Sequence, residues 1–218
     1  VEVLNNYILL TVPTRFIRDW ITSRYLDQIL QIIRGHKKDI IRIEPEDNCT
    51  IICVGRLVYQ KGHRILFHAF KNLLDKGYQV KLSLVGEGPL RNSLEELSEQ
   101  LEISEYCTFH GNLSHAEVIS MTDNSFCTVI PSAYEGLPYV LLESMALEKP
   151  IIASRIDSVK EVINDGHDGL LFHPGDSGDL FEKLSMLIED KVLCEKIKQN
   201  ARRNFINNYS LDDQMPSI

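Results

Sequence analysis

From residue 50 onward, short apolar segments alternate with longer amphipathic ones, and this alternation restricts the chain to very few folds. The apolar segments are brief and rich in β-branched or aromatic residues, as β-strands are. Strands that alternate with helices form βαβ units around a parallel sheet. The sequence therefore predicts a doubly wound, Rossmann-like α/β domain whose strands lie at residues 50–54, 80–85, 107–110, 126–130, 151–153 and 170–172.

The amphipathic segments carry the start and stop signals of helices. A helix expected over residues 63–74 is followed by Gly77, which suits a left-handed C-terminal cap. Ser114 and Glu117 have the spacing of a capping box. Asp176 can cap the first of two final helices.

Residues 1–48 do not share this alternation. An apolar segment at 7–12 precedes one long amphipathic helix expected over 14–34, and residues 39–43 suit one more strand. The polar run 44–48 contains a proline and is typical of a linker. A domain boundary is therefore expected after residue 48.

The composition excludes several kinds of partner and site. A formal net charge of −8 argues against nucleic acid and anionic membranes, because both require a basic surface. No apolar run reaches the roughly 18 residues of a transmembrane helix. The five cysteines are odd in number and three lie in apolar segments, which indicates reduced thiols in a cytoplasmic protein. The histidines are scattered, so the sequence predicts no metal site.

Basic residues lie where the first strand of the core domain leads into its first helix. Gly55 and Arg56 directly follow that strand, and Lys61 precedes the helix. Ligands of doubly wound sheets bind at the carboxyl ends of the strands, where a helix N-terminus attracts phosphate. Two cationic side chains there suit a diphosphate, although a solvated surface pair has the same spacing.

Two carboxylates lie eight positions apart after the fourth strand of the core domain. Glu135 falls in the loop, with Gly136 and Leu137 beside it, while Glu143 lies inside the next helix among apolar residues. An ionised carboxylate can accept hydrogen bonds from both hydroxyls of a ribose, and free amides can meet a phosphate or sugar oxygen. A capping acid and an ion-paired helix glutamate fit the same pattern.

Three further turns are interpreted as mainly structural. Gly86 lies in a Gly-Glu-Gly-Pro turn of the kind that punctuates many loops. His110 and Gly111 end a strand, where the histidine could lie beside a base or simply be hydrogen-bonded within the fold. Residues 165–169 suit a tight turn with glycines at positive φ.

Taken in this order, the motifs resemble those of glycosyltransferase family four (group 1), of the GT-B class, from about residue 50 to residue 209. The shared elements are Gly-Arg-Leu with Lys-Gly at 55–62, Val-Gly-Glu-Gly-Pro at 85–89, Phe-His-Gly at 109–111, the glutamates at 135 and 143, Lys-Pro-Ile-Ile-Ala at 149–153 and Glu-Val-Ile at 161–163. The chain departs from the family at 157–161, where a Gly-Gly-Ile-Pro-Glu-like loop is usual, which weakens the case for phosphate contacts there. Glu148 also replaces the family's usual glycine.

This resemblance implies the donor-binding domain of a retaining glycosyltransferase that uses a nucleoside-diphosphate sugar and needs no cofactor or metal. Arg56 and Lys61 would bind the diphosphate, and Glu143 would hold the ribose. Glu135 would face the transferred sugar and act with Arg56 and Lys61 in catalysis. The other donor-binding residues that the resemblance implies are Gly55, Gly86, His110, Gly111, Gly136, Leu137 and Pro138.

The resemblance also implies the domain organisation. Residues 1–48 would be the tail of an N-terminal, acceptor-side domain plus a linker, 49–209 the nucleotide-sugar-binding domain, and 210–218 the start of a truncated crossing helix. A glycan or lipid-linked acceptor would bind through the missing domain or a partner chain. The protein would be cytoplasmic, and any contact with the inner face of a membrane would be made through that missing domain.

Other functions remain open. The chain could be a non-catalytic nucleotide-binding module, or the donor-binding subunit of a two-chain glycosyltransferase. The joint presence of Arg56, Lys61, Glu135 and Glu143 favours an enzyme. Epimerase chemistry on a related fold is disfavoured, because the sequence shows no separate acid–base pair.

Overall fold

The computed structural model describes residues 2–4, 7–10, 42–45 and 49–210. The chain divides into two units, Val1–Asn48 and Cys49–Ile218. The assignment of the first unit to an acceptor-side domain stays a prediction. So does the crossing helix expected at 210–218, which lies almost wholly outside the described residues.

The described part of the first unit is a small sheet of order β1-β2-β3. Strand β1 (Glu2–Leu4) pairs antiparallel with β2 (Tyr7–Leu10), which pairs in parallel with β3 (Arg42–Pro45). The strand expected at 39–43 is thus found at 42–45, so the first two residues of the expected linker belong to it. Pro45 is tolerated because it ends an edge strand, where a missing amide costs little. The helix expected over 14–34 lies outside the described residues.

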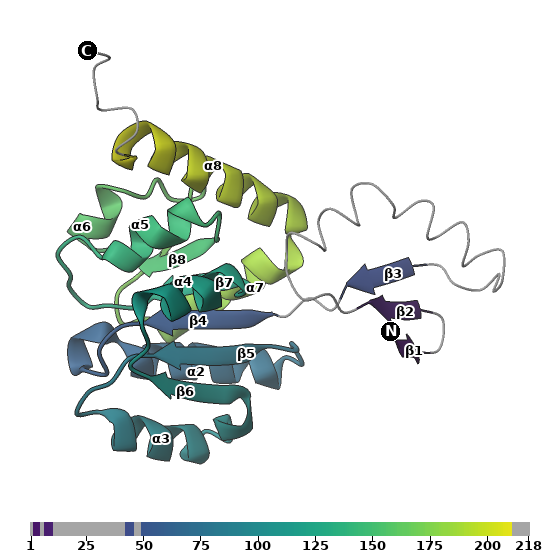
Figure 1. Ribbon diagram of the computed structural model, residues 1–218. Helices are drawn as coiled ribbons and strands as arrows, with labels where there is room; N and C mark the ends of the chain where they lie inside the picture. The colour runs from purple at the N-terminus through teal and green to yellow at the C-terminus, as the bar shows by residue number, and fades with distance from the viewer. Residues whose placement is uncertain (1, 5–6, 11–41, 46–48, 211–218) are drawn as a thin grey trace, which may run out of the picture. The chain divides into compact units, whose positions relative to one another are not determined.

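The second unit contains the predicted parallel sheet. Its strands are β4 (Thr50–Val54), β5 (Lys81–Val85), β6 (Cys107–Gly111), β7 (Cys127–Ile130), β8 (Ile151–Ser154) and β9 (Leu170–Phe172), in the order β6-β5-β4-β7-β8-β9 (Figure 1). Every neighbouring pair in this sheet is parallel. The strand order reverses between β4 and β7, which is the topological switch point where such sheets bind ligands.

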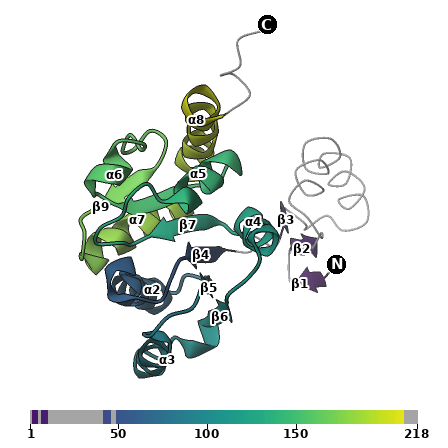
Figure 2. The same ribbon diagram turned by 60° about the vertical axis from the view of Figure 1, so that its left-hand side comes forward.

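Helices cover both faces of this sheet, as the two views show (Figures 1 and 2). The helices that contribute most buried residues to the larger apolar cluster, beside those of the strands, are α2 (His63–Asp75), α3 (Arg91–Gln100) and α7 (Ser177–Glu189). The helices that contribute buried residues to a second cluster are α5 (Tyr139–Ala146), α6 (Asp157–Lys160) and α8 (Lys191–Tyr209). Helix α4 (His115–Asp123) and two short 3-10 helices, η1 (Tyr59–Lys61) and η2 (Ser104–Tyr106), complete the unit. The predicted doubly wound α/β fold is confirmed.

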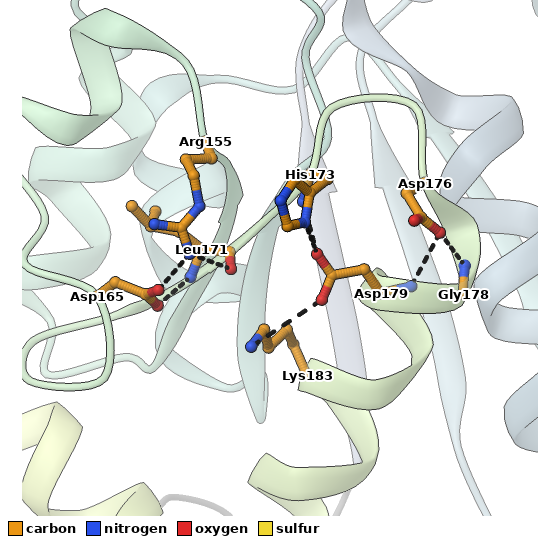
Figure 3. Close-up of polar contacts among 8 residues, drawn as sticks. All are labelled: Arg155, Asp165, Leu171, His173, Asp176, Gly178, Asp179 and Lys183. Carbon is orange, nitrogen blue, oxygen red and sulfur yellow. Dashed lines mark hydrogen bonds and ion pairs between the residues drawn. The ribbon is translucent and has the colours of Figure 1, made fainter.

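The predicted helix signals are also confirmed. Gly77 lies at φ 85 just after α2, and its amide bonds the Leu74 carbonyl at 2.9 Å. The Ser114 hydroxyl accepts from the Glu117 amide, while the Glu117 carboxylate accepts from the Ser114 amide at 2.8 Å. Asp176 caps α7 by accepting from two amides of its first turn (Figure 3).

The turn predicted at 165–169 protects the open edge of β9. Asp165 accepts from the Leu171 amide at 2.8 Å, and Arg155 donates to the Leu171 carbonyl at 3.4 Å while pairing with Asp165 (Figure 3). These side chains occupy the backbone groups that an edge strand otherwise offers to another chain. The turn is structural as predicted, but only Gly166 of its two glycines lies at positive φ, at 74°.

Candidate functional site

Loops from four parallel strands meet at the carboxyl edge of the sheet. The Gly55 amide donates to the Val85 carbonyl at 2.9 Å, which joins the loops after β4 and β5. The Gly86 amide donates to the Gly111 carbonyl at 2.8 Å, which joins β5 to β6. The Ala133 amide donates to the Gln60 carbonyl at 2.7 Å across the switch point. The predicted motifs are therefore held together as one connected set of loops.

Two glycines permit this close approach. Gly62 lies at φ 67, and a Cβ there would stand 2.0 Å from the Pro131 carbonyl oxygen. Gly86 lies at φ 131, and a Cβ there would stand 2.1 Å from the Gly55 carbonyl oxygen. No larger residue fits at either point without moving backbone. Gly86 thus has the structural role that its turn suggested.

Lys61 and Glu135 form an ion pair across the switch point, although 74 positions separate them in the chain. Lys61 is the last residue of η1, shortly before α2, and Glu135 lies in the loop after β7. The Ser132 hydroxyl donates to the same carboxylate oxygen of Glu135 at 2.7 Å. Both charged side chains are mostly buried, so solvent screens their attraction less than it would a surface pair.

Gly55 lies beside this pair, and Arg56 follows it in the chain. The Arg56 side chain is exposed and forms no ion pair with any residue in the described part of the chain. A Cβ on Gly55 would stand 3.5 Å from the Lys61 side chain, so the lysine stem runs over this glycine. The site therefore offers one fixed cation and one free cation at the same edge of the sheet.

The backbone after Glu135 leads into the N-terminus of α5. Pro138 is the N-cap residue, so Gly136 and Leu137 precede the helix instead of starting it. Their amides donate no hydrogen bond within residues 49–210. Free amides next to a helix N-terminus favour an anionic or polar oxygen.

Glu143 is less isolated than its sequence context suggests. One of its carboxylate oxygens lies 3.5 Å from Nδ1 of His115, the first residue of α4, and its side chain is 27% exposed. The contact is longer than a normal hydrogen bond, and the histidine itself is exposed. Glu143 therefore keeps most of its capacity to accept hydrogen bonds from a ligand.

His110 and Gly111 have partners within the fold. His110 Nε2 lies 3.3 Å from the Ser83 hydroxyl oxygen, and burial lowers the pKa of this histidine. Gly111 lies at φ 71, and a Cβ there would stand 2.9 Å from a Glu87 carboxylate oxygen. These contacts fit the interpretation that His110 is hydrogen-bonded within the fold. Contact of His110 with the base of a nucleotide stays a prediction.

His63, next to Gly62, is a residue that sequence reasoning missed. It is the first residue of α2, is 2% exposed, and neither ring nitrogen has a hydrogen-bond partner among the described residues. Burial, with a contribution from the Lys61 charge, lowers its pKa to about 4. A neutral imidazole beside Lys61 leaves the ammonium without a competing cation. No sequence motif identifies His63 as a buried, neutral histidine, because this property depends on how the folded chain packs around it.

The His63 pKa predicts a pH effect on stability. The unfolded chain takes up a proton near the ordinary pKa of 6.5, whereas the folded chain resists it until about pH 4. Stability therefore falls as the pH drops through this window, by about 2 kcal/mol between pH 6.5 and about pH 5. Urea unfolding across this range should show a flatter pH profile for His63→Leu. The matched control His68→Leu, an exposed histidine of the same helix, should keep the wild-type slope. Equal slopes for wild type and His63→Leu would contradict the assignment.

Among the residues that the structure describes, no group of three or more histidine, cysteine, aspartate or glutamate side chains could hold a metal ion. None of the described helices is both long and apolar enough to cross a membrane.

Comparison with known proteins gives a consistent family. The model of the family described as "Glycosyl transferases group 1" matches residues 37–204. The chain is 30% identical over 176 residues to the alpha-D-kanosaminyltransferase of Streptomyces kanamyceticus, covering 79% of this chain and 46% of that protein. It is 33% identical over 164 residues to the capsular polysaccharide biosynthesis glycosyltransferase CapM of Staphylococcus aureus, covering 75% and 43%. The chain thus spans less than half the length of these two relatives.

Solved structures agree with the fold. The C-terminal domain of the group 1 family protein LpcC from Francisella tularensis superposes with a TM-score of 0.69 at 28% identity, covering 74% of this chain and 86% of that one. HepE of Anabaena, in complex with UDP and glucose, superposes with a TM-score of 0.69 at 22% identity, covering 83% and 48%. A second family model, that of the DnaA N-terminal domain, matches residues 1–35, most of which lie outside the described residues.

Proposed function

Since the chain belongs to the glycosyl transferases group 1 family, we propose that its second unit binds the nucleoside-diphosphate sugar of a retaining glycosyltransferase. The observation that carries this proposal is the meeting of Lys61 and Glu135 at the topological switch point, at the sheet edge where the exposed Arg56 also lies. A diphosphate needs fixed positive charge, and this is where a doubly wound sheet can supply it.

Lys61 is suited to bind the diphosphate of the donor, which links its nucleoside to its sugar. An ammonium has three N–H donors, so Lys61 can keep its bond to Glu135 and still reach a phosphate oxygen. The carboxylate holds the end of a flexible four-carbon stem, which reduces the entropy lost when the ligand binds. Arg56 supplies a second, planar donor to the same group. Both charges would oppose the negative charge that develops as the diphosphate leaves, which is where electrostatic preorganisation contributes most.

Glu135 and the neighbouring backbone would face the transferred sugar. Ser132 and Lys61 both bind one oxygen of its carboxylate, which leaves the other oxygen to accept from sugar hydroxyls. The free amides of Gly136 and Leu137 lie next in the chain. In the proposed reaction the bond from the anomeric carbon to the diphosphate breaks while the acceptor oxygen bonds to the same face. The acceptor hydroxyl gives its proton to the departing diphosphate oxygen, and configuration is retained.

Glu143 would hold the ribose hydroxyls, because its carboxylate has only a loose contact with His115. We expect Glu143→Gln to weaken binding of a ribonucleoside diphosphate about tenfold, the size of one charge-assisted hydrogen bond of about 1.5 kcal/mol. Binding of the matching 2′,3′-dideoxynucleotide should change little. Calorimetry with both ligands measures the difference, and equal losses would make Glu143 a structural ion-pair partner.

For the donor and the acceptor we propose only the chemical class. HepE was solved with UDP and with UDP-glucose, so UDP is the first nucleotide to test here. CapM acts in capsular polysaccharide biosynthesis by its name, which favours a glycan or lipid-linked acceptor. That acceptor would contact the remainder of a protein of the relatives' length, or a partner chain.

We expect the reaction to need no divalent metal, because Arg56, Lys61 and the free amides can neutralise the diphosphate themselves. Turnover by the active assembly that contains this chain should persist in excess EDTA at its level in magnesium. Loss of turnover in EDTA, restored by added magnesium, would overturn this expectation. Heat-inactivated enzyme serves as the blank for spontaneous donor hydrolysis.

The alternative functions predict different outcomes. A non-catalytic module would bind a nucleoside diphosphate yet show no transfer in any assembly. A donor-binding subunit would gain transfer on mixing with its partner chain. The ion pair of Lys61 with Glu135 and the cationic Arg56 would serve diphosphate binding in each of these functions, so sugar transfer is the property that distinguishes them. Calorimetric titration of the purified chain with UDP, and then assay of the full-length protein, tests the proposal.

A further inference from the structure

Exposed aromatic side chains concentrate on the two loops that carry Lys61 and Glu135. Tyr59 is 83% exposed, Tyr134 64% and Tyr139 79%. Together with Leu137 they account for four of the eight large hydrophobic side chains that are exposed among the described residues. Soluble surfaces seldom gather aromatic rings in one place without a binding role. We call Tyr59, Tyr134 and Tyr139 the tyrosine rim.

Backbone contacts hold the loops of the rim together. The Ala133 amide bonds the Gln60 carbonyl at 2.7 Å, so the residues next to Tyr134 and Tyr59 touch each other. Gly62 lies against the Pro131 carbonyl in the same junction. Tyr139 is the first residue of α5, directly after the N-cap Pro138. Tyr59 and Tyr134 therefore flank one junction of two loops, and Tyr139 begins the helix that follows the second loop.

A protein interface is a poor explanation for these rings. Tyr134 is the chain neighbour of Glu135, and Tyr59 lies two residues before Lys61. An interface that buried both rings would also close over the ion pair where the diphosphate must enter. A small ligand that enters and leaves with each turnover avoids this conflict.

The donor does not account for the rim either. The proposed function already assigns its diphosphate, ribose and sugar to Arg56, Lys61, Glu143 and Glu135. An acceptor, however, must bring its hydroxyl to the carbon held beside Glu135, and the exposed Tyr134 is the chain neighbour of Glu135. Tyrosine presents a flat apolar face and a hydroxyl, which match the C–H face and the hydroxyl edge of a sugar ring.

We infer that the tyrosine rim binds a sugar ring of the acceptor, so that the acceptor is a glycan whose terminal residues stack on these rings. This inference rests on the proposed function and names its acceptor class. It differs from a lipid acceptor held by its alkyl chain, which needs apolar area without hydroxyl partners.

The test uses saturation-transfer NMR on the purified chain with saturating UDP. The probes are maltotriose, cellotriose and chitotriose, with dodecylphosphocholine below its critical micelle concentration as the alkyl probe. At least one trisaccharide should receive saturation through its ring protons. Tyr59→Ala, Tyr134→Ala or Tyr139→Ala should weaken that binding about tenfold, the effect of losing one stacked ring.

Two controls distinguish failure of the tyrosine-rim inference from failure of the proposed function. Tyr106→Ala removes an exposed tyrosine from η2, before the amino end of β6, and should leave trisaccharide binding unchanged. UDP affinity should be the same in all four variants. Silence of every trisaccharide while UDP binds would overturn the inference alone, as would binding of the alkyl probe only or a dimer that dissociates in the rim variants. Failure of UDP to bind the parent would instead overturn the proposed function.

Discussion

Replacing Lys61 with alanine is expected to weaken UDP binding about 100-fold while changing uridine binding less than about twofold. The variant loses a charge-assisted contact to the diphosphate, which contributes about 1.5–3 kcal/mol, and the nucleoside has no such group. Lys61 is also held in place by Glu135, so little entropy is lost when a phosphate arrives. Isothermal titration calorimetry with both ligands measures the two losses on one scale.

Two further variants test whether the loss of UDP binding comes merely from a destabilised loop or from the removal of any surface lysine. Lys61→Ala leaves the mostly buried Glu135 without its cation, which can destabilise the loop, so Lys61→Ala with Glu135→Gln removes both charges. The double variant should regain thermal stability but not UDP affinity. Lys71→Ala, which breaks a surface pair with Asp75 at 2.9 Å, is the matched control and should bind UDP normally. Equal losses for UDP and uridine in Lys61→Ala would remove Lys61 from the diphosphate site.

The second large expected effect is the near absence of sugar transfer by this chain alone. The 218 residues by themselves are expected to bind donor yet transfer no sugar at a useful rate, because transfer requires donor and acceptor in near-attack contact. Orientation of that kind supplies roughly 7–11 kcal/mol of the barrier, and a donor-binding unit alone supplies little of it. Even a rim that stacks one acceptor sugar does not fix the attacking hydroxyl. Slow hydrolysis of the donor by water is the most that Arg56, Lys61 and Glu135 should support.

Mass spectrometry can test this expectation directly. The purified chain is incubated with UDP-glucose and the three trisaccharides, and both hydrolysed donor and extended acceptor are counted. A group 1 relative of full length, assayed with its own donor and acceptor, is the positive control. Efficient transfer with retained configuration by the 218 residues would show that they contain a complete acceptor site.

The fold was predictable because its signals are local. Each strand of the second unit is a short apolar run, and the helix signals at Gly77, Ser114 and Asp176 act within a few residues. The boundary of β3 was wrong by a few residues, since a proline was interpreted as a linker signal although an edge strand tolerates it at its end.

The site was predictable only as far as motifs specify it. Sequence placed Lys61 and Glu135 at the carboxyl edge, but their pairing depends on the junction of two loops. His115 beside Glu143 and the buried His63 depend on packing between elements, for which no spacing rule exists. Glu148, which replaces a family glycine, lies at φ 54, a left-handed conformation that explains why glycine is usual there.

The central claim is that the carboxyl edge of this sheet binds a nucleoside diphosphate. Thermal unfolding of the purified chain with UDP, GDP, ADP, CDP and dTDP tests it most directly. A ligand at 100 times its dissociation constant stabilises the folded state by about 2.7 kcal/mol, which for a chain of this size raises the Tm by roughly 5–10 °C. At least one of the five diphosphates should give such a rise, and Lys61→Ala should reduce it to about 1 °C at the same concentration. A folded chain whose Tm none of the five changes would contradict the central claim.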